Sequence, residues 1–374
     1  MSVLFVLCVG CLLLYCLMVL RAAWYFGREK EWEESPENWP SVEIIIPARN
    51  EAANITACLK SVLAQQYPGE WQITLINDQS TDETYALATA LAQQNPRLKV
   101  VNLQAGEENS FKKAAISQAI AASKMEMIQQ LDADCLVGEK WLMSMMYYVD
   151  AQTAMVSGPI LLYDHHNLFT SLQTMESMGL VALGAGSMMA GQPNLANAAN
   201  LAYRRSVFER VGGFKDVDQV ASGDDELLLQ KIHRLRSRSI RYAKSRDAIV
   251  RTAVQPTWQT FKAQRLRWVS KARAYENRWT NVIQLISYAG FVSFPLSLVL
   301  ILLGEIHPLW PLVLLLFKSV ADLPLMYLAA GFFHKLPLLR YFPLLQLVYI
   351  PYVLWIGIAG NLVKKYQWKD RMVQ

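Results

Sequence analysis

The 374-residue sequence predicts an α/β domain in the middle of the chain, flanked by membrane helices at both ends. Three observations lead to this prediction. Charged residues make up only 18% of the chain, against about 25% in a typical soluble protein, and they are nearly absent before residue 21 and scarce after Asn281. The middle alternates short β-branched runs with segments of helical periodicity. Apolar runs long enough to cross a bilayer occupy the two ends.

The first apolar run, from Val3 to Leu20, is interpreted as a membrane anchor that ends near residue 26. A secretory signal peptide is the alternative, but no basic residue precedes the run and no small-residue cleavage site clearly follows it. Instead Arg21 and Arg28 follow, with an aromatic belt at residues 24–26. Because basic residues favour the inner side of a membrane, we expect the middle domain to lie in the cytoplasm.

The middle of the chain reads as alternating strands and helices, which predicts a parallel sheet covered by helices on both faces. In open sheets of this kind, ligands bind outside the carboxyl ends of the strands. Polar side chains follow three of the predicted strands directly, so we expect them to line one cleft. The strands are expected at 42–47, 72–76, 98–103 and 127–131, the helices at 52–66, 82–94 and 112–122, and the polar side chains are Arg49, Asn50, Glu51, Asn77, Asp78, Asp82, Asp132 and Asp134.

The tripeptide Asp132-Ala133-Asp134 is a candidate metal site. Two carboxylates at i and i+2, just past a buried strand, can reach one divalent cation. Mg²⁺ or Mn²⁺ suits such oxygen ligands, and a nucleotide diphosphate can complete the coordination shell. Alone, such a tripeptide is more often a solvated loop. Its place after an apolar strand favours the metal interpretation.

The segment Ser222-Gly223-Asp224-Asp225-Glu226 opens a predicted helix. Acidic residues are favoured at a helix N-terminus by the helix dipole, so a capping cluster is one interpretation. Three consecutive acids exceed what a cap requires. The other interpretation is a general base, a carboxylate that takes a proton from an attacking hydroxyl group.

The pentapeptide Gln264-Arg265-Leu266-Arg267-Trp268 lies on a basic, amphipathic stretch at residues 256–281. Arg267 could bind a diphosphate with two hydrogen bonds, and Trp268 offers an apolar face for a sugar ring. A helix at the membrane interface, with Arg and Trp at the level of the lipid headgroups, is the alternative that the local pattern favours.

The C-terminal region at 282–363 holds three candidate spans, followed by a basic tail at 364–374. Lys318 and Asp322 lie one helical turn apart inside the second candidate, and at that spacing they can neutralise each other. Four full spans, counting the anchor, would place the basic tail outside the cell, against the charge rule. We therefore expect two or three spans here, with one segment re-entrant or interfacial. The candidates are Val282–Leu303, Leu309–Phe333 and Leu339–Leu362, and Pro295, Pro311 and Pro324 can each break a helix.

Five motifs occur in one order between Val42 and Trp268, and together they resemble the family 2 glycosyltransferases. The resemblance is to the membrane-integrated members related to cellulose, chitin, hyaluronan and glycosylceramide synthases. It implies a GT-A fold, which is a Rossmann-like mixed sheet, with a nucleotide-diphosphate sugar as donor and inversion at the anomeric carbon. The motifs are Pro47-Ala48-Arg49-Asn50-Glu51, Asn77-Asp78-Gln79-Ser80-Thr81-Asp82, Asp132-Ala133-Asp134, Gly223-Asp224-Asp225 and Gln264-X-X-Arg267-Trp268.

The resemblance also implies roles for single residues. The residues that would contact the nucleotide are Pro47, Arg49, Glu51 and Asp78. Lys112 matches the lysine of the family's Gly-Lys position and would also contact the nucleotide, although Phe111 replaces the usual glycine. Asp132 would hold the nucleotide, and Asp134 with Asp132 would ligate the metal. Asp225, beside Asp224, would be the catalytic base, and Gln264, Arg267 and Trp268 would close over the diphosphate and acceptor. Residues 197–203 with Arg204 and Arg205 resemble the segment beside the donor sugar, and residues 368–371 resemble a cytoplasmic tail of some relatives.

The resemblance divides the chain into a membrane anchor at 1–26, a cytoplasmic catalytic domain at 40–255, an interfacial segment at 256–281, the C-terminal membrane region and the tail. The expected function is metal-dependent transfer of a sugar, most often carried by UDP in such relatives, to a lipid acceptor. A processive polysaccharide synthase is the main alternative, and a polyprenyl-phosphate transferase is less favoured. Expected partners are the nucleotide sugar, the bilayer, and proteins of a polysaccharide or glycolipid pathway.

Other classes of protein fit the sequence less well. A transporter would need polar residues in several spans, a scaffold protein would not keep the carboxylates intact, and no basic-aromatic module predicts nucleic-acid binding. The five cysteines lack metal-ligand spacing. His165 and His166 are interpreted as an exposed loop pair, and Met175, Met178, Met188 and Met189 as core residues.

Overall fold

The computed structural model describes residues 3–30, 36, 38–103, 111–163, 167–216, 223–270, 278–362, 366–368 and 371–373. The chain forms two compact units. The sheet unit comprises Glu29–Asp164, Gly191–Val254 and Gln367–Gln374. The helical unit comprises Met1–Arg28, His165–Ala190 and Gln255–Tyr366. Each unit is therefore assembled from segments that are distant in the sequence.

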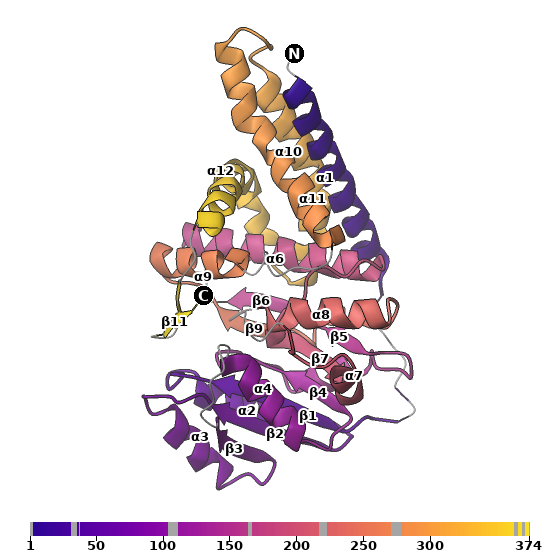
Figure 1. Ribbon diagram of the computed structural model, residues 1–374, viewed down its shortest axis with the longest axis vertical. Coiled ribbons are helices and arrows are strands. Elements are labelled where there is room, and N and C mark those ends of the chain that lie inside the picture. The colour runs from indigo at the N-terminus through magenta and orange to yellow at the C-terminus, as the bar shows by residue number, and fades with distance from the viewer. Residues whose placement is uncertain are drawn as a thin grey trace. The chain divides into compact units, whose positions relative to one another are not determined.

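The sheet unit is built on a seven-stranded sheet in the order β3-β2-β1-β4-β7-β5-β8 (Figure 1). Neighbouring pairs among β3, β2, β1 and β4 are parallel, and β7 is antiparallel to both β4 and β5. The short strands β6 and β9 pair separately, as do β10 and β11. The strands are β1 (Val42–Ala48), β2 (Trp71–Asn77), β3 (Leu98–Asn102), β4 (Met127–Gln130), β5 (Met155–Ser157), β6 (Ile160–Tyr163), β7 (Leu201–Arg204), β8 (Ile240–Tyr242), β9 (Val250–Ala253), β10 (Tyr366–Trp368) and β11 (Arg371–Val373).

The helices of the sheet unit follow the strands that precede them in the chain, and both faces of the central strands are covered. Ile44 and Ile46 of β1 belong to one apolar core together with Leu59, whereas Ile45 points to the other face and is equally buried. The alternation of side chains along a strand explains why three consecutive apolar residues are needed at 44–46. These elements are α2 (Ile55–Leu63), α3 (Thr84–Ala92), α4 (Phe111–Ala122), α5 (Trp141–Met146), η1 (Ala198–Asn200), α7 (Arg205–Arg210) and α8 (Asp224–Leu235).

The predicted strands and helices of the first half are confirmed. The strand expected at 42–47 is β1, the one expected at 72–76 is β2, and the helix expected at 112–122 is α4. The parallel pairing expected of the first four strands is confirmed, and β7, which lies outside those strands, runs antiparallel between β4 and β5. The mixed sheet that the family resemblance implied is therefore the one observed.

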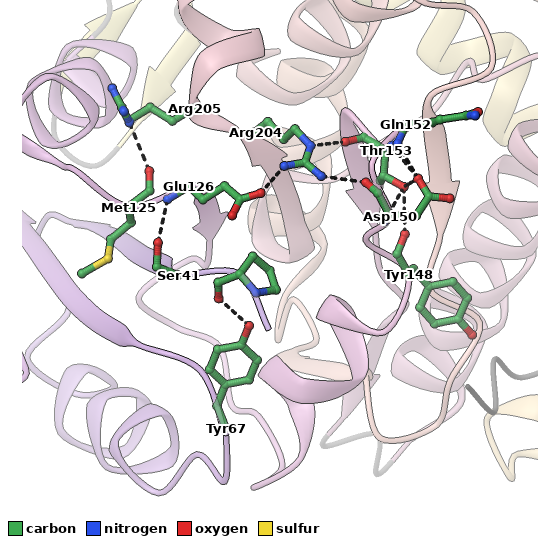
Figure 2. A network of polar contacts seen from close by, with 11 residues as sticks. Ser41, Tyr67, Met125, Glu126, Tyr148, Asp150, Gln152, Thr153, Arg204 and Arg205 are labelled. Atoms are coloured by element: carbon green, nitrogen blue, oxygen red, sulfur yellow. Dashed lines mark hydrogen bonds and ion pairs between the residues drawn. The ribbon is translucent and has the colours of Figure 1, made fainter. Parts of the chain in front are cut away.

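A polar network fastens the amino end of β4 to the end of β7 (Figure 2). Arg204 donates from Nε to the Thr153 carbonyl oxygen at 2.7 Å and from Nη2 to the Asp150 carbonyl oxygen at 2.6 Å, and it forms an ion pair with Glu126. Arg205 donates to the Met125 carbonyl oxygen at 3.1 Å. Both arginines thus lie at the end of β4 opposite to Asp132, where they brace the fold.

The helical unit contains four helices long and apolar enough to cross a membrane among the described residues. In Figure 1, α1, α10 and α11 run side by side, whereas α12 is inclined to them and lies near α6 and α9. The bounds are α1 (Val3–Arg28), α6 (Leu168–Met189), α9 (Trp258–Ser270), α10 (Arg278–Leu302), α11 (Trp310–Phe332), η3 (Leu336–Tyr341) and α12 (Phe342–Leu362). The number of spans and the side of the tail stay predictions.

Helix α1 packs deeply into the helical unit. Its residues Phe5, Leu12 and Cys16 are at most 2% exposed. At Gly290 of α10, an added Cβ would lie 2.9 Å from the Cα of Leu12, so the two backbones touch where no side chain separates them. The interpretation of this helix as a membrane anchor stays a prediction.

The Lys318–Asp322 pair forms as the sequence predicts, and it is part of a larger cluster. Lys318 Nζ lies 2.6 Å from Asp322 Oδ2 and donates to Gln346 Oε1 at 2.6 Å. Gln346 Nε2 and the Tyr15 hydroxyl donate to the two oxygens of Asp322 at 3.1 and 3.0 Å. Helices α1, α11 and α12 are thereby joined by one buried polar cluster.

Helix α6 differs from the sequence-based domain boundaries. Residues 165–190 fall within the range 40–255 that the sequence assigns to the catalytic domain, yet they belong to the helical unit. Helix α6 contacts α1 and α11, and an added Cβ at Gly186 would lie 2.2 Å from the Ala22 carbonyl oxygen. A helix with so little polar surface is buried among other apolar helices rather than beside a solvated loop.

Candidate active site in the sheet unit

The loops that follow β1 and β2 are bound to each other at the carboxyl edge of the sheet. Ala48 pairs with Asn77 at the ends of the two strands. Arg49 Nη1 then donates to the carbonyl oxygens of Asp78 at 2.8 Å and Gln79 at 3.0 Å. Arg49 and Asp78 are both buried. The predicted meeting of these two loops is therefore observed.

Glu51 is held in the same corner. Its backbone N–H donates to Thr84 Oγ1 at 2.7 Å, and Asn54 Nδ2 donates to its Oε2 at 2.8 Å. Asp82 accepts from the Ala52 N–H at 3.0 Å. Burial alone would raise the pKa of Asp82, but the hydrogen bonds from the Thr84 hydroxyl and the Ala52 N–H outweigh it and lower that pKa. Pro47 lies one residue before the end of β1, opposite Ile76.

Lys112 links the acids of two separate motifs. Its Nζ lies 2.8 Å from Asp132 Oδ1, just after β4, and 3.5 Å from Asp224 Oδ2, at the start of α8. Burial would lower the pKa of Lys112, yet the carboxylates of Asp132 and Asp224 raise it overall. Burial raises the pKa of Asp224, Lys112 opposes that rise, and Asp225 and Asp132 add to it. This lysine therefore neutralises part of a concentrated negative charge.

Asp225 is held at the first turn of α8. Its Oδ2 accepts from the Ala198 N–H at 3.2 Å, and its Oδ1 accepts from the Glu226 N–H at 2.7 Å. Gly223, just before the helix, has φ +79°, a left-handed conformation that glycine adopts without strain. Asn200 holds the Ala198 segment in place by donating to the carbonyl oxygens of Pro159 and Ala248 at 2.9 and 2.8 Å. The start of the segment 197–203 thus lies beside the acids, although its end at Arg204 does not.

Two buried thiols support the Asp132–Asp134 turn. Cys58 Sγ donates to the Asp132 carbonyl oxygen at 3.8 Å, and Cys135 Sγ donates to Asp134 Oδ1 at 3.5 Å. Burial, with the nearby carboxylate of Asp134, raises the pKa of both thiols, so they stay protonated donors. Cysteine spacing gave no signal for this arrangement, because the two residues are distant in the sequence.

Asp132 and Asp134 could supply part of the coordination shell of a divalent cation, but not all of it. Asp132 and Asp134 offer oxygen ligands of the kind that Mg²⁺ and Mn²⁺ prefer. Within the described residues, no group of three or more His, Cys, Asp or Glu side chains is arranged to hold a metal. A cation here would need further oxygen ligands, and the phosphates of a nucleotide could provide them. The donor set therefore fits a metal that binds together with its nucleotide.

The remaining sequence-based candidates lie elsewhere. Gln264, Arg267 and Trp268 are on α9 of the helical unit, so their expected role toward the donor stays a prediction. His165, His166 and Ser222 lie outside the described residues, as do Lys369 and Asp370 of the tail motif.

Comparison with known proteins shows which families and relatives this chain is similar to. Residues 43–212 match the family model of glycosyl transferase family 2. The chain is 31% identical over 116 residues to the beta-monoglucosyldiacylglycerol synthase of Synechocystis sp., covering 31% of this chain and 24% of that protein. It is 26% identical over 253 residues to the poly-beta-1,6-N-acetyl-D-glucosamine synthase of Staphylococcus aureus, covering 65% and 59%.

Among solved structures, the mannosyltransferase PcManGT from Pyrobaculum calidifontis, in complex with GDP-Man and Mn²⁺, superposes with a TM-score of 0.57 at 18% identity. The match covers 96% of this chain and 98% of that one. At this identity the likeness concerns the fold. The chain spans little more than half of the length of two other curated relatives that it matches, 56% of one and 59% of the other.

The mixed sheet and the likeness to the solved mannosyltransferase identify a GT-A fold. More narrowly, the segment of residues 43–212 is similar to the family 2 glycosyltransferases.

Proposed function

We propose that this protein transfers one sugar, or very few, from a nucleotide-diphosphate sugar to the hydroxyl group of a membrane lipid, with inversion at the anomeric carbon. The observation that supports it most directly is the bridge from Lys112 to Asp132 and Asp224, at 2.8 and 3.5 Å. This bridge brings Asp132, which we propose for the nucleotide, close to Asp224, the neighbour of the proposed base, within the sheet unit. The match to family 2 and the fold agree with the chemistry.

In the proposed mechanism Asp225 is the general base. Its carboxylate accepts two backbone N–H bonds, which orient it at the start of α8 and leave it able to take the proton of an acceptor hydroxyl. The hydroxyl attacks the anomeric carbon from the face opposite to the leaving diphosphate. The buried Arg49, Glu51 and Asp78 would hold the nucleoside.

The Asp132–Asp134 turn would hold a divalent cation with the diphosphate. When bound, Mg²⁺ or Mn²⁺ stabilises negative charge on the departing nucleotide. Lys112 contributes a fixed positive charge next to the same acids. The solved mannosyltransferase of the same fold was determined with GDP-Man and Mn²⁺, which fits a metal-dependent donor site. We expect UDP as the nucleotide of this protein.

The lipid acceptor is proposed from two observations. One relative is a glycolipid synthase, the beta-monoglucosyldiacylglycerol synthase, and the described residues include four helices long and apolar enough to cross a membrane. Such a protein would receive a lipid hydroxyl from the bilayer. The second candidate is a processive polysaccharide synthase, because the poly-beta-1,6-N-acetyl-D-glucosamine synthase aligns over a longer segment.

The decisive test is donor turnover by the detergent-purified protein, with a panel of nucleotide sugars, Mn²⁺ or Mg²⁺ and total membrane lipid. Mass spectrometry of the lipid fraction should show a product heavier by one sugar. Chelation by EDTA should abolish transfer, and added metal should restore it. Asp225→Asn should lower kcat by roughly 10²–10⁴-fold, as expected for loss of a general base, and should leave nucleotide binding within a fewfold of the wild type.

A ladder of sugar additions would favour the processive candidate and exclude the single-transfer proposal. Full activity of Asp225→Asn would exclude Asp225 as the base. The matched control is Asp247→Asn, which removes a carboxylate elsewhere in the sheet unit. We expect this variant protein to turn over donor at the wild-type rate.

A further inference from the structure

Helix α9 carries Gln264, Arg267 and Trp268, and it is held by one face of α6. Phe169, Gln173 and Glu176 follow one another at spacings of four and three residues, so they share a face of α6. The Phe169 ring lies 5.5 Å from the Phe261 ring. Each side chain of this face contacts α9 or the residues that lead into it, which fixes the helix along its length.

Gln173 determines where the chain enters α9. Its Nε2 donates to the Gln255 carbonyl oxygen at 3.0 Å, and its Oε1 accepts from the Gln255 N–H at 3.1 Å. The side-chain amide thus satisfies both backbone groups of Gln255, as a neighbouring strand would do. Because both hydrogen bonds must form together, the position of Gln255 is specified closely.

Glu176 binds the middle of α9 through Arg265. Arg265 Nη2 lies 2.6 Å from Glu176 Oε2, and the two side chains are 4% and 7% exposed. Burial lowers the pKa of Arg265, but the Glu176 carboxylate outweighs burial and raises it overall. A buried pair of this kind is costly to break, because either partner alone would be an uncompensated charge.

The rest of the Arg265 guanidinium contacts two residues of the pentapeptide motif. Its Nη1 donates to Gln264 Oε1 at 2.6 Å. Its Cζ lies 4.2 Å from the centroid of the Trp268 ring and 4.5 Å from that of Phe261. One planar group therefore binds Glu176 on one side and holds both Gln264 and Trp268 on the others.

We propose that Arg265, anchored by Glu176, is a positioning residue that fixes the side chains of Gln264 and Trp268 for sugar transfer. The inference rests on the proposed function. Arg265 itself is buried and would not touch the substrate. It acts by limiting the conformations of its two neighbours, since an interaction misplaced by about 1 Å can cost 10²-fold in rate.

The variant that separates positioning from simple charge pairing is Arg265→Lys. Lysine keeps the positive charge beside Glu176, but it lacks the planar fork that reaches Gln264 and stacks on Trp268. The control is Lys262→Gln on the same helix. Lys262 is exposed, and its Nζ lies 5.5 Å from the Trp355 ring. It makes no contact with Gln264 or Trp268 among those described.

Two measurements on the full-length protein in detergent test the proposal. The first is ¹⁹F NMR of protein labelled with 5-fluorotryptophan, with the Trp268 resonance identified by its loss in Trp268→Phe. We expect Arg265→Lys to shift or broaden this resonance, and Lys262→Gln to leave it unchanged. The second is turnover, where Arg265→Lys should lower kcat by at least about tenfold while nucleotide affinity stays within twofold.

An unchanged Trp268 resonance or wild-type kcat in Arg265→Lys would overturn the inference alone. A melting temperature that falls together with activity, with the Trp268 resonance unmoved, would make Arg265 merely structural and also overturn it. Absence of turnover and of nucleotide binding in the wild type would instead overturn the proposed function, and the inference with it. The ¹⁹F result separates these cases, because it does not depend on activity.

Discussion

Single residues of the sheet unit show how a local sequence signal can predict which side chains lie close together. Each of Arg49, Asp78 and Asp132 follows a predicted strand. Arg49 donates a hydrogen bond to the Asp78 carbonyl oxygen in the neighbouring loop, and Asp132 forms an ion pair with Lys112 on α4. The same reasoning could not place Arg204 and Arg205. A family motif records the order of residues along the chain, whereas the end of β7 at which an arginine lies depends on the antiparallel register with β4.

Asp150 gives a prediction about acid stability at this scale. Burial would raise its pKa, but hydrogen bonds from Thr153 and Gln152 and the charge of Arg241 outweigh burial and lower it. Its stabilising contribution is fully present above the pKa of an unfolded aspartate, about 3.9, and is lost as the pH falls through the lower folded value. The side chain is 41% exposed, so the effect is modest.

We expect Asp150→Asn to melt at a lower temperature than the wild type at pH 7 and to differ less from it near pH 3. Thermal unfolding monitored by intrinsic fluorescence across this range measures the difference. A gap between the two proteins that stays constant from pH 7 to pH 3 would contradict the assignment of the stabilisation to the ionised carboxylate.

The sequence predicts secondary-structure elements well where they depend on a local pattern. It predicts their direction and position less well where these depend on contacts with residues far away in the chain. The strands and helices from residue 42 to 131 follow from periodicity and turn residues. The antiparallel direction of β7 and the position of α6 do not, because both depend on contacts with segments far away in the chain. The Glu176–Arg265 pair, 89 residues apart, is likewise invisible to any local pattern.

The packing of α1 against α10 leads to a prediction about an element. An added Cβ at Gly290 would meet the backbone of Leu12 at 2.9 and 3.0 Å, and a backbone cannot turn aside as a side chain can. Gly290→Ala should therefore separate the two helices and cost roughly 1–3 kcal/mol. The matched control is Gly10→Ala on α1, where an added Cβ has no neighbour within 4 Å.

The measurement is the melting temperature of the purified protein in detergent, followed by the fraction that stays monodisperse in size-exclusion chromatography. Gly10→Ala should be neutral or slightly stabilising, because alanine favours the helix more than glycine does. Equal behaviour of the two variants would show that close approach of α1 and α10 is not required.

At the scale of the whole molecule, the buried cluster around Lys318 determines how the helical unit is assembled. Lys318→Met leaves Asp322 charged without a cation, and breaking a buried pair in this way costs roughly 3–5 kcal/mol. In Lys318→Met with Asp322→Asn no buried charge is left, and the asparagine can still accept from Tyr15. We expect the double variant to recover part of the stability that the single variant loses.

Thermal unfolding of the single variants, the double variant and the wild type forms a double-mutant cycle. A coupling free energy near zero would mean that Lys318 and Asp322 stabilise the unit independently, which their separation of 2.6 Å argues against.

The insertion of α6 between two parts of the sheet unit has a consequence for the modularity of this protein. The chain leaves the sheet unit at residue 164, contributes a 22-residue helix to the helical unit, and returns at residue 191. Trimming the membrane helices from both ends would therefore not release a self-sufficient soluble enzyme. A fragment of residues 29–254 would keep α6 without α1 and α11, its apolar partners, and should aggregate. For the same reason, the sheet unit could not be exchanged as one cassette between membrane carriers, since its three segments, 29–164, 191–254 and 367–374, require cuts at five places rather than two.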